Sequence, residues 1–108
     1  MAGVVHIPWY ATGFRGDALA EAVAEIAALA LRFGASGYEV VRSRDDRYRI
    51  LQMVTFESKL DWERYWNGPE LVDFRARHSS WYQVPVLYVW HDRVARGEFG
   101  AAAPSQAA

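Results

Sequence analysis

Three histidines are the side chains of this sequence that could exchange a proton near neutral pH. Imidazole is a common general base in enzymes because its ordinary pKa lies near physiological pH. His6 falls in a β-rich segment beside Tyr10, on the strand face that we expect to look toward the helices. His78 ends a helical segment, and His91 precedes Asp92 near the end of the last strand, where a surface position is expected. His6 and His78 are therefore the candidate catalytic residues.

Both candidates also have a purely structural interpretation. His6 could be a partly exposed strand residue near the N-terminus, and His78 could be a cation favoured by the negative end of a helix, where it caps the last carbonyls. No two histidines share a helical i,i+4 face, and none joins a glutamate in a recognised spacing. The sequence therefore predicts no metal site.

Large rings are concentrated between residues 62 and 82. Trp62 and Trp66 are four residues apart and share one helical face, with Tyr65 beside them. Together with Phe74 and Tyr82, Tyr65 and Trp66 could wall a pocket for a flat substrate. The alternative is that these rings are core residues that dock a helix on a sheet, and this interpretation is favoured for Trp62.

Arg42 is a cation at the end of an otherwise apolar strand. It could pair with a substrate carboxylate or enolate, and Tyr10 on the first strand could shape the same pocket. A surface position is the ordinary alternative for such an arginine. The sequence contains no Ser-His-Asp order typical of hydrolases, and no glycine-rich loop that precedes a helix and cradles phosphate.

Composition restricts the class of protein. The chain has 108 residues, which suits one domain, with 52% hydrophobic and 15% aromatic residues. Its formal net charge of −1 and interspersed arginines do not make the basic field that nucleic acid requires. There is no cysteine and no apolar run long enough to span a bilayer. We expect a cytoplasmic protein that binds neither nucleic acid nor membrane.

Four segments have the residue types and alternation of β-strands. They are Val4–Tyr10, Gly37–Arg42, Tyr48–Phe56 and Val84–His91. The polar segment 43–47 between the second and third is predicted to be a hairpin loop. The segment 95–108 is rich in small and polar residues and is predicted to be a flexible tail. One domain is therefore expected over residues 1–94.

Two helical segments lie between these strands. Apolar residues at three- and four-residue spacing predict a helix over Asp17–Phe33, with Gly34 as its stop. Ser58 is predicted to be the N-cap of a second helix, which Asn67–Pro69 interrupts and His78 ends. The resulting order, β-α-β-β-α-β, predicts an α+β fold: a ferredoxin-like antiparallel sheet with both helices on one face.

Both faces of the predicted sheet are apolar, although the two helices can cover only one. On the first strand Val5, Ile7 and Trp9 lie opposite His6 and Tyr10, and the last strand carries apolar side chains on both faces. An exposed apolar sheet face is unfavourable in water. We therefore expect a homodimer in which two sheets pack against each other to form a barrel-like interface.

The sequence resembles the dimeric α+β barrel superfamily, and within it the antibiotic-biosynthesis-monooxygenase-like group, which includes haem-degrading monooxygenases. The resemblance rests on VVHIPWY, SGYEVVRS and the pattern FES…W…YWNGP, and it spans the predicted strands. It implies a pocket between helices and sheet that holds a small aromatic polyketide, a quinol or haem. It also implies that oxidation often proceeds without flavin or metal, because the substrate forms the carbanion that reacts with oxygen.

The haem-degrading branch departs from this sequence at three positions. The resemblance aligns Pro8 with that branch's Asn, Tyr65 with its Trp and Phe74 with its iron-ligating His. Trp66 and His78 would take over only after a shift of register, and a phenyl ring cannot ligate iron. The resemblance therefore implies no tightly bound cofactor, with haem binding kept as an alternative.

Three hypotheses follow for the function. The first is a small homodimeric monooxygenase-like enzyme that oxidises a flat hydrophobic or aromatic molecule without a tightly bound cofactor. The second is a non-catalytic module that binds haem or another hydrophobic ligand. The third is a dimer whose core is filled and has no ligand pocket. A cavity beside His6 or His78 would favour the first over the third.

Overall fold

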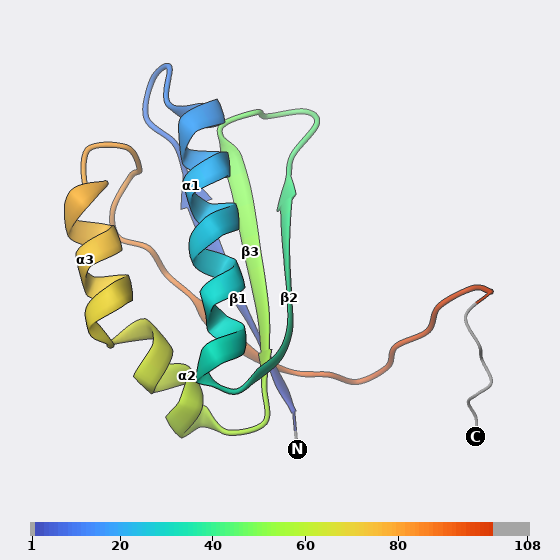
Figure 1. The fold of residues 1–108 in the computed structure, drawn as a ribbon. Helices are drawn as coiled ribbons and strands as arrows, with labels where there is room; N and C mark the ends of the chain where they lie inside the picture. Colours follow the sequence, from blue (N-terminus) through green and yellow to red (C-terminus); the bar gives the residue numbers. More distant parts are fainter. Residues whose placement is uncertain (1, 101–108) are drawn as a thin grey trace.

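The computed structural model describes residues 2–100 as one sheet with helices on one side (Figure 1). Its strands are β1 (Gly3–Tyr10), β2 (Ala35–Arg42), β3 (Arg49–Phe56) and β4 (Val89–Asp92). Its helices are α1 (Gly16–Ala28), the 3₁₀-helix η1 (Leu29–Phe33), α2 (Lys59–Trp66) and α3 (Pro69–Arg77). All strand pairs are antiparallel in the order β2-β3-β1-β4. The predicted ferredoxin-like α+β fold is confirmed.

Capping and helix-breaking residues in the sequence correctly predicted several helix ends. Ser58 caps α2 by accepting a hydrogen bond from the backbone N–H of Asp61 at 3.1 Å. The second helix breaks after Trp66, and Pro69 begins α3 as predicted. Gly34 ends η1 with a φ of 99°, which suits a residue without a Cβ.

The first helix differs from its prediction near both ends. It begins at Gly16 rather than Asp17, with Arg15 at the N-cap, and the α-helical part stops at Ala28. The predicted last turn is instead the 3₁₀-helix η1. Tighter 3₁₀ turns are common where α-helices end.

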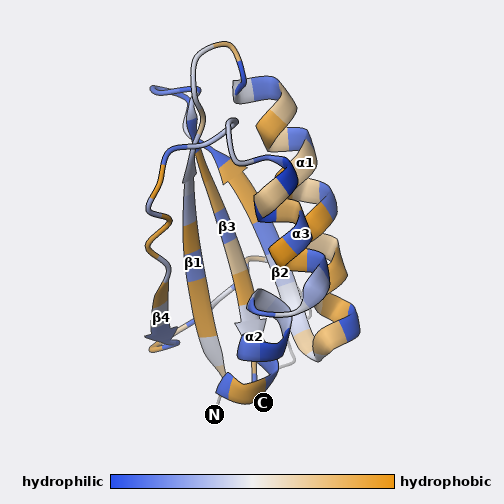
Figure 2. Cartoon of the chain, turned by 90° about the vertical axis from the view of Figure 1, so that its left-hand side faces the viewer, coloured by the Kyte–Doolittle hydropathy of each residue, from blue (hydrophilic) through white to orange (hydrophobic). Residues whose placement is uncertain are grey.

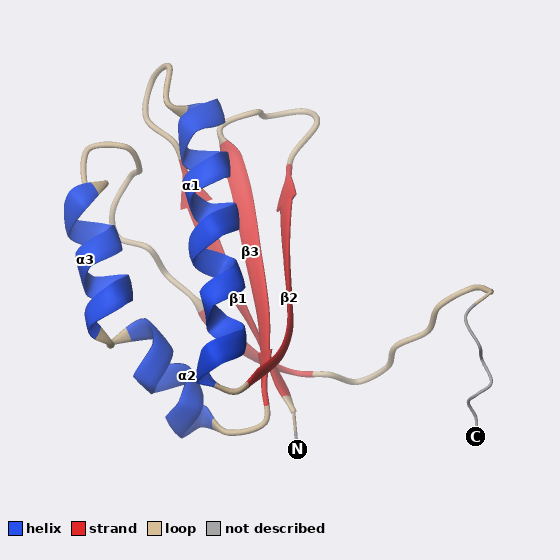
Figure 3. Ribbon diagram, viewed as in Figure 1, coloured by secondary structure: helices blue, strands red, loops and turns tan. Residues whose placement is uncertain are grey.

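The fourth strand is shorter than its prediction. Only Val89–Asp92 pair with β1, along Gly3 to His6. Pro85 has no N–H to donate to a ladder, and Val84 is 73% exposed. The segment 84–88 therefore runs beside the sheet without joining it. After β4 the chain leaves the sheet as a loop (Figure 3). Of the predicted tail, residues 101–108 lie outside the described part of the chain.

The core lies between the sheet and the helices. Alternate residues of β1 and β3 are fully buried there, among them Val5, Ile7, Trp9, Ile50 and Val54. The sequence-based prediction that His6 looks toward the helices is wrong. His6 alternates with Val5 and Ile7, and the helices cover the face with the larger apolar side chains because that covering removes more apolar surface from water.

The opposite face, here called the open face, carries side chains from all four strands. Within the described residues no helix covers it (Figure 2). Its members alternate with the core residues and pair across the strands: Val4, His6, Pro8, Tyr10, Gly37, Glu39, Val41, Arg49, Leu51, Met53, Thr55, Val89 and His91. Val41 is 42% exposed and Val89 is 52% exposed. A sheet face that mixes apolar side chains with Glu39, Arg49 and two histidines is therefore left without helices over it.

Candidate functional site

Four of the rings predicted to bind substrate lie in the core. Tyr65, Trp66, Phe74 and Tyr82 are all buried. Three of them surround the indole of Trp9, with ring centroids at 6.0 Å for Trp66, 5.7 Å for Phe74 and 5.0 Å for Tyr82. Edge-to-face pairs at such distances are favourable packing arrangements. These rings therefore fill much of the space between the helices and the sheet.

A buried polar chain crosses this core. The Trp9 indole N–H donates to the Gln52 amide oxygen at 2.9 Å, and the Gln52 amide nitrogen donates to the Tyr65 hydroxyl at 3.0 Å. The Tyr65 hydroxyl in turn donates a hydrogen bond to the Ile26 carbonyl at 2.6 Å. Burial raises the pKa of Tyr65 well above its ordinary value. Its hydroxyl therefore stays protonated and connects α2 to α1.

A surface groove of about 250 Å³ between α1 and α3, here called the α1–α3 groove, opens beside one of these rings, Phe74. Its apolar part comes from three α1–η1 residues and one ring of α3: Ala22, Ile26, Leu29 and Phe74. Glu25, Arg77 and His78 complete its lining. Helical spacing accounts for the arrangement, because residues three and four apart share one face of α1 and of α3.

His78 is a titratable residue of the groove, and contacts with its neighbours hold its ring in place. Its Nδ1 lies 2.8 Å from the Phe74 carbonyl oxygen. In the neutral ring Nδ1 carries the hydrogen for this bond, so Nε2 keeps its lone pair. The ring also packs on Phe74 and Trp81, with centroids 4.4 and 4.6 Å away. The arrangement presents one basic nitrogen on a fixed ring beside an apolar surface.

His6, the other candidate base, lies on the open face. Its ring is 4.3 Å from that of His91, centroid to centroid. Burial lowers the pKa of His6, and the neighbouring charge of His91 lowers it further. Because the sheet separates His6 from the α1–α3 groove, His6 and His78 of one chain do not serve one site. The contact with His91 was missed, since no local spacing links residues 85 positions apart.

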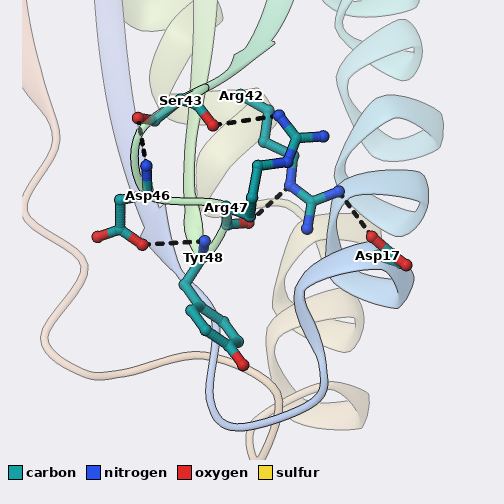
Figure 4. Close-up of polar contacts among 6 residues, drawn as sticks. All are labelled: Asp17, Arg42, Ser43, Asp46, Arg47 and Tyr48. Atoms are coloured by element: carbon teal, nitrogen blue, oxygen red, sulfur yellow. Dashed lines mark hydrogen bonds and ion pairs between the residues drawn. The ribbon is translucent and has the colours of Figure 1, made fainter.

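Tyr10 and Arg42 also lie away from the groove. The Tyr10 hydroxyl donates to Asp46 at 2.7 Å, a bond that raises the pKa of Tyr10 and lowers the pKa of Asp46. The Arg42 guanidinium bonds Asp17 at 2.8 Å and the Arg47 carbonyl at 2.6 Å (Figure 4). These bonds tie the β2–β3 loop to the start of α1. Of the residues predicted from sequence, the structure thus brings His78 and Phe74 together in the groove.

Between residues 2 and 100, no three His, Cys, Asp or Glu side chains gather as a metal-binding group within a single chain. None of the described helices is long and apolar enough to cross a membrane.

No protein-family model matches the sequence, and no curated protein matches it. Similar solved structures do exist. A candidate antibiotic biosynthesis monooxygenase from Nitrosomonas europaea superposes with a TM-score of 0.77 at 16% identity, covering 86% of this chain and 90% of its own. A Mycobacterium tuberculosis protein gives 0.76 at 13% identity, with coverages of 91% and 100%. A Pseudomonas aeruginosa protein gives 0.76 at 17% identity, with coverages of 87% and 95%.

At these identities the comparison bears on the fold, because one fold hosts many functions. The superposition extends over most of each chain. The chain therefore has the antibiotic-biosynthesis-monooxygenase-like fold that was inferred from its sequence.

Proposed function

We propose that this protein is a homodimeric monooxygenase-like enzyme that oxidises a small, flat aromatic molecule in the α1–α3 groove, with His78 as general base. The observation that carries the proposal is the fixed His78 ring, whose Nδ1 is held by the Phe74 carbonyl at 2.8 Å. Its Nε2 is then the atom that accepts a proton. The apolar residues beside it suit the faces of an aromatic substrate.

The chemistry needs a substrate that is acidic at carbon, such as an anthrone-type ketone. His78 removes a proton from the ring CH₂ group, which leaves a carbanion delocalised into the carbonyl. The carbanion reduces molecular oxygen; one oxygen atom forms the new C=O bond and the other leaves as water with the two CH₂ hydrogens. The CH₂ group loses four electrons and O₂ gains four. Substrate and O₂ thus balance without a further reductant.

The size of the groove favours a few fused rings over haem. Pockets for drug-sized ligands span roughly 300–1,000 Å³, whereas this groove measures about 250 Å³. A porphyrin is larger than such ligands, and the buried rings of Trp66 and Phe74 occupy the space beneath the groove. The residues present therefore do not fit a haem.

The dimer is the second part of the proposal. Its support is the open face, where Val4, Leu51 and Met53 on inner strands and Val41 and Val89 on the outer ones leave apolar surface exposed. Soluble chains rarely leave a contiguous apolar sheet face in water. A second copy packed sheet to sheet would bury the same face of both chains, as a two-fold interface does.

Oxygen uptake with a panel of anthrone- and quinol-type substrates tests the enzyme. We expect consumption of one O₂ for each anthrone oxidised, and a loss of about 100-fold or more in kcat for His78→Gln, the range expected for a lost general base. Unchanged far-UV circular dichroism of the variant would show that its fold survives. No turnover across the panel, or full turnover by His78→Gln, would refute the proposal.

Two alanine-to-leucine variants, one inside the groove and one outside it, test where the substrate binds. Ala22 lines the groove, whereas Ala24 is an exposed residue of the same helix outside its lining. We expect Ala22→Leu to raise KM and the matched Ala24→Leu to leave it unchanged. Equal KM values for the two variants would place the substrate elsewhere. Sedimentation tests the dimer separately, and a stable monomer at micromolar concentration would overturn it.

A further inference from the structure

The open face carries a pair of histidines that the fold and the proposed reaction leave unused. His6 on β1 and His91 on β4 are separated by 85 positions in sequence, yet their ring centroids lie 4.3 Å apart with the planes tilted by 45°. Both are half-buried. The antiparallel ladder places them diagonally, because His6 pairs with Val89 and His91 pairs with Val4. Two imidazoles are thus held side by side by the pairing of two strands.

The His91 ring is oriented as metal-binding histidines are. Its Nδ1 lies 3.1 Å from the Val4 carbonyl oxygen. In the neutral ring Nδ1–H donates to that carbonyl, and Nε2 keeps its lone pair. A backbone carbonyl that fixes the tautomer and direction of an imidazole is the usual outer partner of a metal-ligating histidine.

The spacing of the two rings suits a chelate. Metal–imidazole bonds of about 2.0–2.1 Å at a tetrahedral angle hold two ligand nitrogens roughly 3.4 Å apart. Rings whose centroids are 4.3 Å apart reach this separation when His6 turns about its side-chain torsions while the Val4 carbonyl holds His91. Imidazole donors favour zinc, copper, cobalt and nickel over magnesium and calcium.

One chain alone supplies two ligands, since residues 2–100 contain no group of three or more. The second pair comes from the position of His6 in the sheet. β1 and β3 are the inner strands, and His6 pairs with Met53 near the middle of the ladder that runs from Gly3 to Tyr10. In a two-fold contact the residues closest to the axis meet their own copies. A sheet-to-sheet dimer centred there brings His6 and His91 of both chains together.

We propose that His6 and His91 form half of a tetrahedral site for a divalent transition-metal ion, completed by the same two histidines of a second copy. The site rests on the proposed dimer but not on the proposed reaction. The apolar Val4, Met53 and Val89 beside the ligands shield the site from water. The ion would connect the two sheets at their centre, where Zn²⁺ has the matching preference for four nitrogen ligands.

Titration of untagged protein with Co²⁺, followed by Zn²⁺ competition, tests the site. We expect saturation at one Co²⁺ per two chains, with the intense visible bands of four-coordinate Co²⁺. His6→Gln and His91→Gln should each weaken binding at least tenfold, whereas the matched His78→Gln on the other face should bind as the parent does. In sedimentation, Zn²⁺ should lower the dimer dissociation constant of the parent and not that of His91→Gln.

Three results would overturn the site: no saturable binding at micromolar metal, binding that both open-face variants retain, or one ion per chain. Sedimentation in a chelator separates this failure from others. A protein that is a dimer in the chelator, and that binds no Co²⁺ or Zn²⁺ after the chelator is removed, refutes the metal site and leaves the proposed function standing. Metal binding at one ion per dimer, with no oxygen uptake by any substrate, supports the site and refutes the proposed reaction.

Discussion

The buried chain Trp9–Gln52–Tyr65 gives a stability prediction that can be worked through in numbers. Gln52 is fully buried and lies in the middle, accepting from the Trp9 indole and donating to the Tyr65 hydroxyl. Gln52→Leu keeps the approximate volume but leaves the indole N–H without a partner in the core. A buried donor left unsatisfied costs about 1–3 kcal/mol. We expect a destabilisation of about 2 kcal/mol.

Tyr65→Phe acts on the same chain from its other end. It removes the acceptor of the Gln52 amide and the donor to the Ile26 carbonyl. Two buried groups then lack partners, so we again expect about 2 kcal/mol. In the Gln52→Leu background the amide is already gone, and only the Ile26 carbonyl is left. The second change should then cost about 1 kcal/mol less, which is the coupling energy of the pair.

Urea unfolding followed by tryptophan fluorescence measures all four corners of this cycle. With a slope of about 2 kcal/mol per molar urea, each single variant should unfold about 1 M earlier than the parent. Every variant is compared at one protein concentration, because a dimer's midpoint depends on it. Tyr38→Phe is the matched control, since Tyr38 is 42% exposed, and its change should stay within about 0.5 kcal/mol. Additive single effects, or single effects as small as the control, would refute the reasoning.

Three further outcomes are expected. Phe14 is fully exposed at a φ of 63°, a conformation that costs a non-glycine residue about 1–2 kcal/mol. Phe14→Gly should therefore raise the free energy of unfolding by about 0.5–1 kcal/mol, whereas Phe14→Ala should not. A lower free energy of unfolding in Phe14→Gly would contradict this. Gly34 has a φ of 99°, and an added Cβ would lie 2.9 Å from a carboxylate oxygen of Asp61. Gly34→Ala should therefore lower the free energy of unfolding by about 1–2 kcal/mol, which a fall in the thermal unfolding temperature would show. An unchanged temperature would rule out the strain. The hydrogen bond from Tyr10 lowers the pKa of Asp46 in the folded protein below its ordinary 3.8. Asp46 therefore contributes stability above pH 3.8, and this contribution is lost as the pH falls through the pKa of the folded state. In acid titrations monitored by circular dichroism, Asp46→Asn should lose less stability between neutral and acidic pH than the parent, and parallel curves would argue against the bond.

Much of the fold follows from local rules. Alternation predicted three of the strands to within about one or two residues at each end, and Ser58 and Pro69 marked the starts of α2 and α3. These signals work because a hydrogen-bonded cap, or a ring that fixes φ, acts on the residues next to it. The fourth strand failed because ladder pairing depends on a distant partner, and Pro85 denies its segment an N–H.

The candidate site was predictable in part. His78 and Phe74 were named from the sequence, and the carbonyl of one orients the ring of the other four residues later along the same helix. Glu25 and Arg77, the charged residues of the groove lining, were missed. Their position in the groove depends on how α1 packs beside α3, which no local pattern predicts. Charged residues are also common on any exposed helix face, so their charge did not distinguish them as site residues.

The sequence by itself determined the element order, the starts of α2 and α3 and the surplus of apolar surface, because these depend on residue types a few positions apart. Only the tertiary structure decided which face of β1 the helices cover. It buried Trp9 against the rings of α2 and α3, and left His6 on the open face beside His91. Period-two alternation fixes which residues share a face but not which face is covered. That choice is made when whole elements pack, and it follows the larger apolar area.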